Sequence, residues 1–317
     1  MKILVRLMSL VLWGIAHSLQ AQTYPAKPIR FIVGVPAGTN TDVAARLFAA
    51  PMRARLGQPI LVENRAGGNL TIAANVVAKA DPDGYTLFFG AVTPFQPTFV
   101  KNNAVDALAE LAPVSMASSS EYLMSVSAKV PANNWNEALA WVKANPGKVN
   151  FASLAPFFDI IMSMLKQRNG LVYTSIPYTA TSQALPQLLS GDLHIVLSAA
   201  PFFAPYIREG GIRPLFSTGR SAMFPAVPTA GDVGLGELDA LRFNLSIWAP
   251  LKTPKEAIQV VSDATIAAAR VPEVVEQYRK LFGTDPQGST PEETRRIVAA
   301  ELKAWAELAR LANYAPQ

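Results

Sequence analysis

The chain has 317 residues, of which 50% are hydrophobic and 16% are charged. This length suits two α/β lobes or one large domain, and the composition is that of a folded chain rather than a disordered one. Because cysteine is absent and only His17 and His194 occur, disulfides, thiolate metal sites, a cysteine nucleophile and a histidine-based metal cluster are excluded. The net charge of +5 is a weak signal, and without a basic stripe we expect no nucleic-acid partner.

The first 21 residues have the pattern of an export signal. Lys2 and Arg6 precede an apolar stretch over 7–16, and small and polar residues lead to Ala21. The apolar stretch is shorter than the ~20 residues that cross a bilayer, which argues against a transmembrane anchor. We therefore expect residues 1–21 to be a signal peptide that is cleaved after Ala21, and the mature chain to be periplasmic.

Strands and helices alternate in the first part of the mature chain. Predicted strands cover 28–35, 59–62 and 85–89, and predicted helices begin after Asp42 and at Ile72. Thr41 or Asp42 is expected to cap the first helix, and Pro51 to bend it. This alternation predicts a parallel sheet with right-handed crossovers, which is an α/β fold.

A second set of alternating elements follows. The predicted helices are 135–144, with Asn133 or Asn134 as the cap, and 182–189, and the predicted strands are 149–152, 193–197, 212–218 and 243–248. Three helices are expected at the end of the chain, over 254–269, 272–282 and 291–311. The last of these begins with Thr290-Pro-Glu-Glu293, a capping box with proline at the first helical position.

Several short motifs match one family in order and at the right separations. They are Tyr24-Pro-Ala-Lys-Pro-Ile-Arg30, Val35-Pro-Ala-Gly38, Leu56-Gly-Gln-Pro59, Val62-Glu-Asn-Arg65, Ala80-Asp-Pro-Asp-Gly-Tyr-Thr-Leu87, Ala249-Pro-Leu-Lys-Thr-Pro254 and the closing helix with Trp305. On these motifs the chain resembles the Bug (TctC-like) family, the extracytoplasmic solute receptors of tripartite tricarboxylate transporters. The resemblance covers essentially the whole mature chain.

The resemblance implies a type II periplasmic-binding-protein fold, in which two α/β lobes are joined by crossing hinge strands around a ligand cleft. By this resemblance lobe one takes 24–118 and 246–317, and lobe two takes 119–245. It also implies a small organic carboxylate as the ligand, and the membrane subunits of a tripartite transporter as partners. A membrane sensor is the alternative partner. We expect a monomer without cofactor or metal.

The turns after the first three strands are expected to form the ligand site. They open onto helix N-termini at one end of a parallel sheet, where main-chain N–H groups and helix dipoles favour an anion. Each hydrogen bond to a charged group contributes about 1.5–3 kcal/mol, so three or four approach the roughly 8 kcal/mol of micromolar binding without any Lys or Arg. The predicted contacts are Pro36, Ala37, Gly38, Thr39, Asn40, Asp42, Gly67, Gly68, Asn69, Ala91, Val92 and Thr93.

Simpler interpretations of these residues stay open. Gly38 could be only a turn glycine, Asp42 only a helix cap, and the Gly67-Gly68 pair only a flexible loop. His194 alternates within an apolar strand, which favours a structural role.

Lobe two departs from the family pattern in its expected contact segments. Relatives have a loop rich in Ser, Gly, Asn and Thr where this chain has the apolar segment 151–159. The predicted contacts here are Ser153, Phe157, Phe158, Tyr178, Thr179 and Ser198. Burying one Phe-sized group contributes about 1.5–3 kcal/mol, which favours a monocarboxylate with an aromatic or apolar tail over citrate or a dicarboxylate. The alternatives are that the phenylalanines pack inward, or that the receptor binds little.

An enzyme is the main competing class. The sequence has no G-x-S-x-G, H-E-x-x-H or Walker A motif and no complete G-x-G-x-x-G. A pair of cleft carboxylates would revive this interpretation, but Asp81 and Asp83 fit a turn. We therefore expect a binding protein with no catalytic residues.

Overall fold

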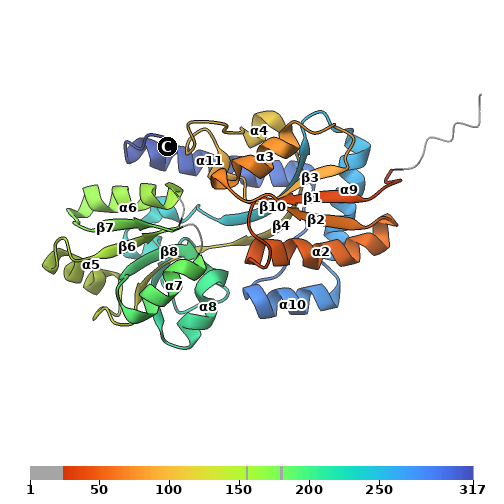
Figure 1. Cartoon of the computed structure of the whole chain (residues 1–317). Helices are drawn as coiled ribbons and strands as arrows, with labels where there is room; N and C mark the ends of the chain where they lie inside the picture. The colour runs from red at the N-terminus through yellow and green to blue at the C-terminus, as the bar shows by residue number, and fades with distance from the viewer. Residues whose placement is uncertain (1–23, 155, 179–180, 317) are drawn as a thin grey trace, which may run out of the picture.

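The computed structural model describes residues 24–154, 156–178 and 181–316 (Figure 1). It contains two five-stranded sheets with helices on both faces of each. We call the first sheet with its helices lobe one and the second sheet with its helices lobe two. The predicted α/β class is confirmed.

The first sheet has the strand order β2-β1-β3-β10-β4. Its strands are β1 (Ile29–Val33), β2 (Ile60–Asn64), β3 (Thr86–Gly90), β4 (Leu111–Ser120) and β10 (Phe243–Pro250). The predicted parallel pairing is confirmed for β2, β1 and β3, whereas β10 runs antiparallel to both β3 and β4. The helices of lobe one are α2 (Asn40–Leu56), α3 (Thr71–Ala78), α4 (Ala107–Glu110), α9 (Lys255–Ala268), α10 (Pro272–Phe282) and α11 (Pro291–Leu311).

The second sheet has the order β7-β6-β8-β5-β9. Its strands are β5 (Tyr122–Ser127), β6 (Asn150–Ser153), β7 (Thr174–Pro177), β8 (Ile195–Ala199) and β9 (Ile212–Ser217). Its helices are α5 (Trp135–Ala144), α6 (Pro156–Asn169), α7 (Thr181–Ser190) and α8 (Ala200–Arg208). Four short 3-10 turns complete the fold: η1 (Gly68–Leu70), η2 (Thr93–Phe95), η3 (Gly231–Val233) and η4 (Gly236–Leu238).

The chain crosses between the sheets at two places. Only Glu121 separates β4 of the first sheet from β5 of the second, and the chain returns through β10, where Phe243 pairs with Ser120. Helix α11 packs on β4 and also on α6 of lobe two, and α10 packs on α8 (Figure 1). The two lobes therefore touch through helices as well as through the crossing strands.

The cores explain why each helix lies where it does. In lobe one, the apolar side chains of β1 and β3 pack against α2, α9 and α10 on one face of the sheet, and against α3 and α11 on the other. In lobe two, α5 and α6 cover one face and α7 and α8 cover the other. Removing this apolar surface from water is the main stabilising contribution.

Two predicted caps are confirmed and one is wrong. The Thr290 side chain accepts a hydrogen bond from the Glu293 amide at 3.2 Å, and Asn134 accepts one from the Glu137 amide at 3.0 Å. Helix α2 instead starts earlier than predicted: Thr39 has the extended N-cap conformation, so Thr41 and Asp42 lie inside the first turn. The helix then continues through Pro51 to Leu56.

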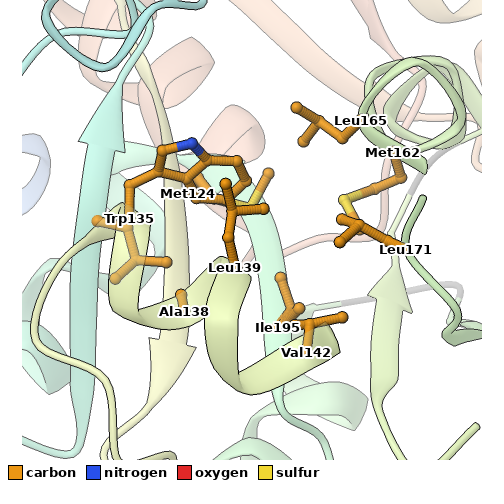
Figure 2. A pocket seen from close by; sticks show the side chains of 10 residues that line it. Met124, Trp135, Ala138, Leu139, Val142, Met162, Leu165, Leu171 and Ile195 are labelled. Carbon is orange, nitrogen blue, oxygen red and sulfur yellow. The ribbon is translucent and has the colours of Figure 1, made fainter. Parts of the chain in front are cut away.

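A small cavity lies in the core of lobe two, between α5, α6 and the sheet (Figure 2). It has a volume of about 10 Å³ and is lined only by apolar side chains, among them Met124, Trp135 and Leu165. Such a volume holds about one water at most, and an apolar lining gives that water no partners. This cavity is a packing gap and not a ligand site. In the described part of the chain, no helix is long and apolar enough to cross a membrane.

Candidate functional site

The turns that follow the first three strands meet at one edge of the first sheet. We call residues 34–39 loop one, 65–70 loop two and 91–93 loop three. Strand β1 lies between β2 and β3 and is parallel to both, so all three loops leave the same edge. A methyl group on Gly34 would lie 2.8 Å from Leu70 Cδ2, and one on Gly90 would lie 3.9 Å from Thr41 Cγ2. Because η1 also contacts η2, the three loops converge.

The first turn of α2 has main-chain donors without protein acceptors. Its N-cap residue, Thr39, makes no side-chain cap, because its hydroxyl donates to the Pro36 carbonyl at 2.8 Å. Within the described residues, the N–H groups of Asn40 and Thr41 have no hydrogen-bond acceptor. Asn40 is partly exposed, so solvent or a ligand can reach this end of the helix. Free amides and the positive end of the helix dipole together favour an anion there.

Asp42 organises loop one from within the protein. Its carboxylate is 2% exposed and accepts hydrogen bonds from the Gly38 amide at 2.9 Å, Asn64 Nδ2 at 2.9 Å and Arg46 Nε at 3.0 Å. Burial alone would raise the pKa of Asp42, but the bonds from Arg46, Gly38 and Asn64 outweigh it and lower that pKa. These hydrogen bonds give Asp42 a positioning role in loop one. The Gly38 amide is already used internally.

We expect Asp42→Ala to destabilise the protein by about 1–3 kcal/mol at pH 7, because it leaves the Gly38 amide and Arg46 without their acceptor. Asp42→Asn, which keeps an acceptor oxygen, should cost less. The pKa of Asp42 lies below its ordinary 3.8 in the folded state, so its contribution is complete above that pH and is lost as the pH falls further. Urea unfolding measures both variants. A difference between wild type and Asp42→Ala that did not shrink toward pH 3 would contradict this role.

Loop two adopts an uncommon backbone conformation. Gly67, Gly68, Asn69 and Leu70 have consecutive φ values of 123°, 57°, 49° and 69°. Glycine adopts such angles at little cost and asparagine tolerates them, whereas leucine is strained. Leu70 is held there by its contact with Gly34 and by a hydrogen bond from its amide to the Gly67 carbonyl at 3.0 Å. Gly67, Gly68 and Asn69 are exposed.

Loop three is buried and is hydrogen-bonded to the carboxylate of Glu301, a residue that the sequence did not single out. The Thr93 hydroxyl donates to Glu301 Oε1 at 2.5 Å, and Asn244 Nδ2 donates to Glu301 Oε2 at 2.6 Å. Glu301 is 4% exposed, and burial raises its pKa to about 7 although these hydrogen bonds lower it. Glu301 lies on the buried stripe of α11 with Val298 and Trp305. A charged residue on an apolar helical stripe is the signal that could have identified it.

The polar contacts predicted in lobe two are satisfied within that lobe. The Ser153 hydroxyl donates to Asp159 Oδ2 at 2.7 Å, the Tyr178 hydroxyl to Gln187 Oε1 at 2.7 Å, and the Ser198 hydroxyl to the Ala199 carbonyl at 3.3 Å. Ser153 and Ser198 are buried. Thr179 lies outside the described residues. The hydroxyl groups of Ser153, Tyr178 and Ser198 are therefore already engaged within lobe two.

Phe157 and Phe158 pack inward, as the alternative interpretation has it. They are 5% and 6% exposed. They belong to an aromatic cluster drawn from both lobes, which we define as Phe99, Tyr122, Phe157, Phe158 and Trp305. The Phe157 ring centroid lies 5.1 Å from that of Trp305 and 5.9 Å from that of Phe99, and the Phe158 centroid lies 5.2 Å from that of Tyr122. The contacts with Trp305 and Tyr122 are edge-to-face and that with Phe99 is tilted, and such aromatic pairs add to the apolar burial.

His194 has the structural role expected from its strand. Its Nδ1 accepts a hydrogen bond from the Asn150 amide at 3.0 Å, and its ring lies 5.3 Å from that of Trp141. Burial lowers its pKa, although Asp192 raises it.

Known proteins are similar to this chain in both sequence and fold. The family described as tripartite tricarboxylate transporter family receptor (TctC) matches residues 44–313. Protein BugT of Bordetella pertussis is 33% identical over 304 residues, which cover 94% of this chain and 93% of BugT. The UPF0065 protein in the gbd 5' region of Cupriavidus necator is 31% identical over 288 residues, covering 90% of this chain and 87% of that protein.

Two solved structures extend the likeness to three dimensions. The periplasmic binding protein BugD has a TM-score of 0.81 at 26% identity, and covers 93% of this chain and 100% of its own. R. palustris Rpa4515 with adipate has a TM-score of 0.82 at 25% identity, with the same coverage of 93% and 100%. The chain is thus a member of the TctC family of tripartite tricarboxylate transporter receptors, the Bug-type solute-binding proteins, and has their periplasmic-binding-protein fold.

Proposed function

We propose that this receptor captures a small organic carboxylate between its two lobes, and that the main-chain N–H groups of loops one to three bind the carboxylate. The observation that carries the proposal is the first turn of α2, where the Asn40 and Thr41 amides have no acceptor among the described residues and open onto the converging loops. The relative Rpa4515, with its adipate, supports a carboxylate ligand. Lys and Arg are absent from loops one and three, so in these two loops the main chain supplies the positive potential.

The lobes are proposed to close on the ligand about the crossing strands. We propose that the boundaries of the moving bodies lie within β4 and β10, so that residues 24–118 and 246–317 move together and residues 119–245 move against them. The short connection at Glu121 and the entry into β10 support hinge motion at these points. Closure would bring α6 and α8 of lobe two over the carboxylate and present a new face to membrane partners. A ligand shifts this equilibrium only if it binds the closed state more tightly.

For the far end of the ligand we propose an apolar segment rather than a second or third carboxylate. The Ser153, Tyr178 and Ser198 hydroxyls are engaged within lobe two and so are not free to bind a second carboxylate. A polar far end would lose hydrogen bonds to water without gaining partners. The proposed ligand differs at this end from the adipate of the relative Rpa4515, which has a carboxylate at each end.

Calorimetry on the purified mature chain tests both the function and the ligand class, with benzoate, adipate and citrate as probes. Binding of benzoate more tightly than adipate or citrate is the expected result. Tighter citrate binding would overturn the proposed ligand class while leaving the receptor function intact. If none of a broad library of carboxylic acids raised the melting temperature, the proposed function itself would be lost.

Export and delivery complete the proposal. Residues 1–21 are proposed as a signal peptide cleaved after Ala21, which would place a monomeric receptor in the periplasm. The membrane subunits of a tripartite transporter are the proposed recipients, on the strength of the family. N-terminal sequencing of the exported protein checks the cleavage point. Loss of uptake of the identified acid after deletion of the gene checks the delivery, and unchanged uptake would contradict it.

A further inference from the structure

We infer that Glu301 is a proton-linked positioning residue: it takes up a proton when a carboxylate binds at loop three. The inference rests on the proposed function, because it needs an anion at the loop that Glu301 supports. It adds a coupling between ligand affinity and pH that the receptor function alone does not require.

Glu301 joins three parts of the molecule that meet at the candidate site. One carboxylate oxygen accepts from Thr93 of loop three at 2.5 Å, and the other accepts from Asn244 at 2.6 Å. Asn244 lies in β10 opposite Ser119 of β4, at the crossing between the lobes. The carboxylate itself comes from α11, which packs on both lobes. The position of loop three is therefore tied to the crossing strands through this one group.

No cation neutralises Glu301 in the part of the chain that the structure describes. It forms no ion pair there. The charge of Glu301 acts on one buried ionisable group, Tyr122 of β5. Burial raises the pKa of Tyr122, and the negative charge of Glu301 raises it further. Other charged groups on the surrounding segments are at least partly exposed and do not shift its pKa: Lys101, Glu121, Asp159, Asp263 and Lys303.

Glu301 accepts two hydrogen bonds, whereas an ionised carboxylate has roughly four sites that can accept one. Trp305 Nε1 and Asn244 Oδ1 are buried and have no hydrogen-bond partner among the described residues. The indole N–H nevertheless lowers the pKa of Glu301. An unpaired, incompletely solvated carboxylate is costly to keep ionised.

A bound anion would raise the free energy of the ionised form of Glu301 relative to the protonated form. The ligand carboxylate at the Val92 and Thr93 amides would place a second negative charge near the first, in surroundings of low polarity, and like charges favour the protonated form. The proton comes from solvent and binds Oε1. Glu301 can then donate to Thr93 Oγ1, and the Thr93 hydroxyl hydrogen is free to turn to another acceptor. Its pKa of about 7 in the free protein means that this uptake falls in the physiological pH range.

Calorimetry of the mature chain with adipate and with benzoate at pH 6, 7 and 8.5 tests this coupling. Benzoate is fully ionised at all three pH values, so its own titration does not contribute, whereas adipate is still partly protonated at pH 6 and the benzoate series therefore decides. We expect the wild-type affinity to fall by roughly 3–30-fold from pH 6 to 8.5, with proton uptake visible as a dependence of the binding heat on the buffer. Glu301→Gln, which mimics the protonated group, should keep the pH 6 affinity at pH 8.5. Glu307→Gln, on the exposed face of the same helix, is the control and should behave as wild type.

The outcomes separate the inference from the proposed function. Equal wild-type affinity at pH 6 and 8.5 without proton uptake overturns the inference and leaves the receptor function standing. A Glu301→Gln variant that retains the full pH dependence also overturns it. Failure of the wild type to bind any carboxylic acid overturns the proposed function instead. If Glu301→Gln does not fold, the buffer dependence of the wild-type binding heat decides alone.

Discussion

Glu301→Gln is expected to make the protein more stable than the wild type at pH 8, by up to about 3 kcal/mol. Burial raises the pKa of Glu301 from 4.5 to about 7, so the folded state holds its proton over a pH range in which the unfolded chain has lost it. Ionising the buried carboxylate therefore costs the folded state about 1.4 kcal/mol for each unit of the difference. The amide of the variant has no charge to bury and keeps an acceptor oxygen for Asn244.

The pH window of this effect follows from the two pKa values. Between pH 4.5 and about 7 the unfolded state binds fewer protons than the folded state, so stability falls as the pH rises. Above pH 7 both states are ionised and the full cost remains. Urea unfolding should give a difference below about 1 kcal/mol at pH 5 and the full difference at pH 8. Glu307→Gln is the matched control. A Glu301→Gln variant less stable than wild type at pH 8 would contradict this account.

Phe157→Ala is expected to cost about 3–5 kcal/mol of stability. The Phe157 ring is 5% exposed and packs between Phe99 of lobe one, Tyr122 of the crossing strand and Trp305 of α11. Truncation would remove its dispersion contacts and leave a cavity, because rings from three separate elements cannot all move in to fill it.

Phe202→Ala is the matched control for this substitution. Phe202 is only partly buried and its ring faces Phe243 at 5.4 Å, so its loss should cost about 1–2 kcal/mol. Chemical unfolding measures both variants, and benzoate calorimetry follows any change in binding. If Phe157→Ala lost less stability than Phe202→Ala and abolished benzoate binding, the ring would line the ligand space instead of filling the core.

The sequence predicted correctly the parts of the fold that depend on residues close together in the chain. The Thr290 capping box, the Asn134 cap and the parallel strands β1, β2 and β3 are all encoded within short segments. Helices α6 and α8 were missed because they begin with apolar runs such as Pro156-Phe-Phe and Pro201-Phe-Phe. Such runs do not show the polar and apolar alternation of a surface helix. Helix α2 starts about one turn before the position predicted from the sequence. Thr39, and not Thr41 or Asp42, has the extended backbone conformation of the N-cap residue.

The candidate site was predictable in place but not in detail. Parallel strands fix which loops share an edge, so loops one to three could be named from the strand pattern alone. The hydrogen bond from the Gly38 amide to Asp42 could not be predicted. The sequence offers several possible acceptors for this amide, and Asp42, four residues away, is only one of them. The Thr93–Glu301 bond joins residues 208 positions apart, and no local pattern specifies such a pair. The inward packing of Phe157 likewise depends on Trp305, which only the folded α11 brings to it.

Calorimetry of Asn40→Pro against Asn40→Ala, with adipate as the ligand, tests most directly whether main-chain amides capture the carboxylate. Proline suits the first helical position, and Thr39 already has the extended conformation, φ −74° and ψ 161°, that a residue before proline requires. Proline removes the N–H of residue 40, whereas alanine removes only the side chain. We predict a loss of roughly 10–100-fold in affinity for Asn40→Pro and less than about 3-fold for Asn40→Ala. Wild-type affinity in a folded Asn40→Pro variant would contradict the account.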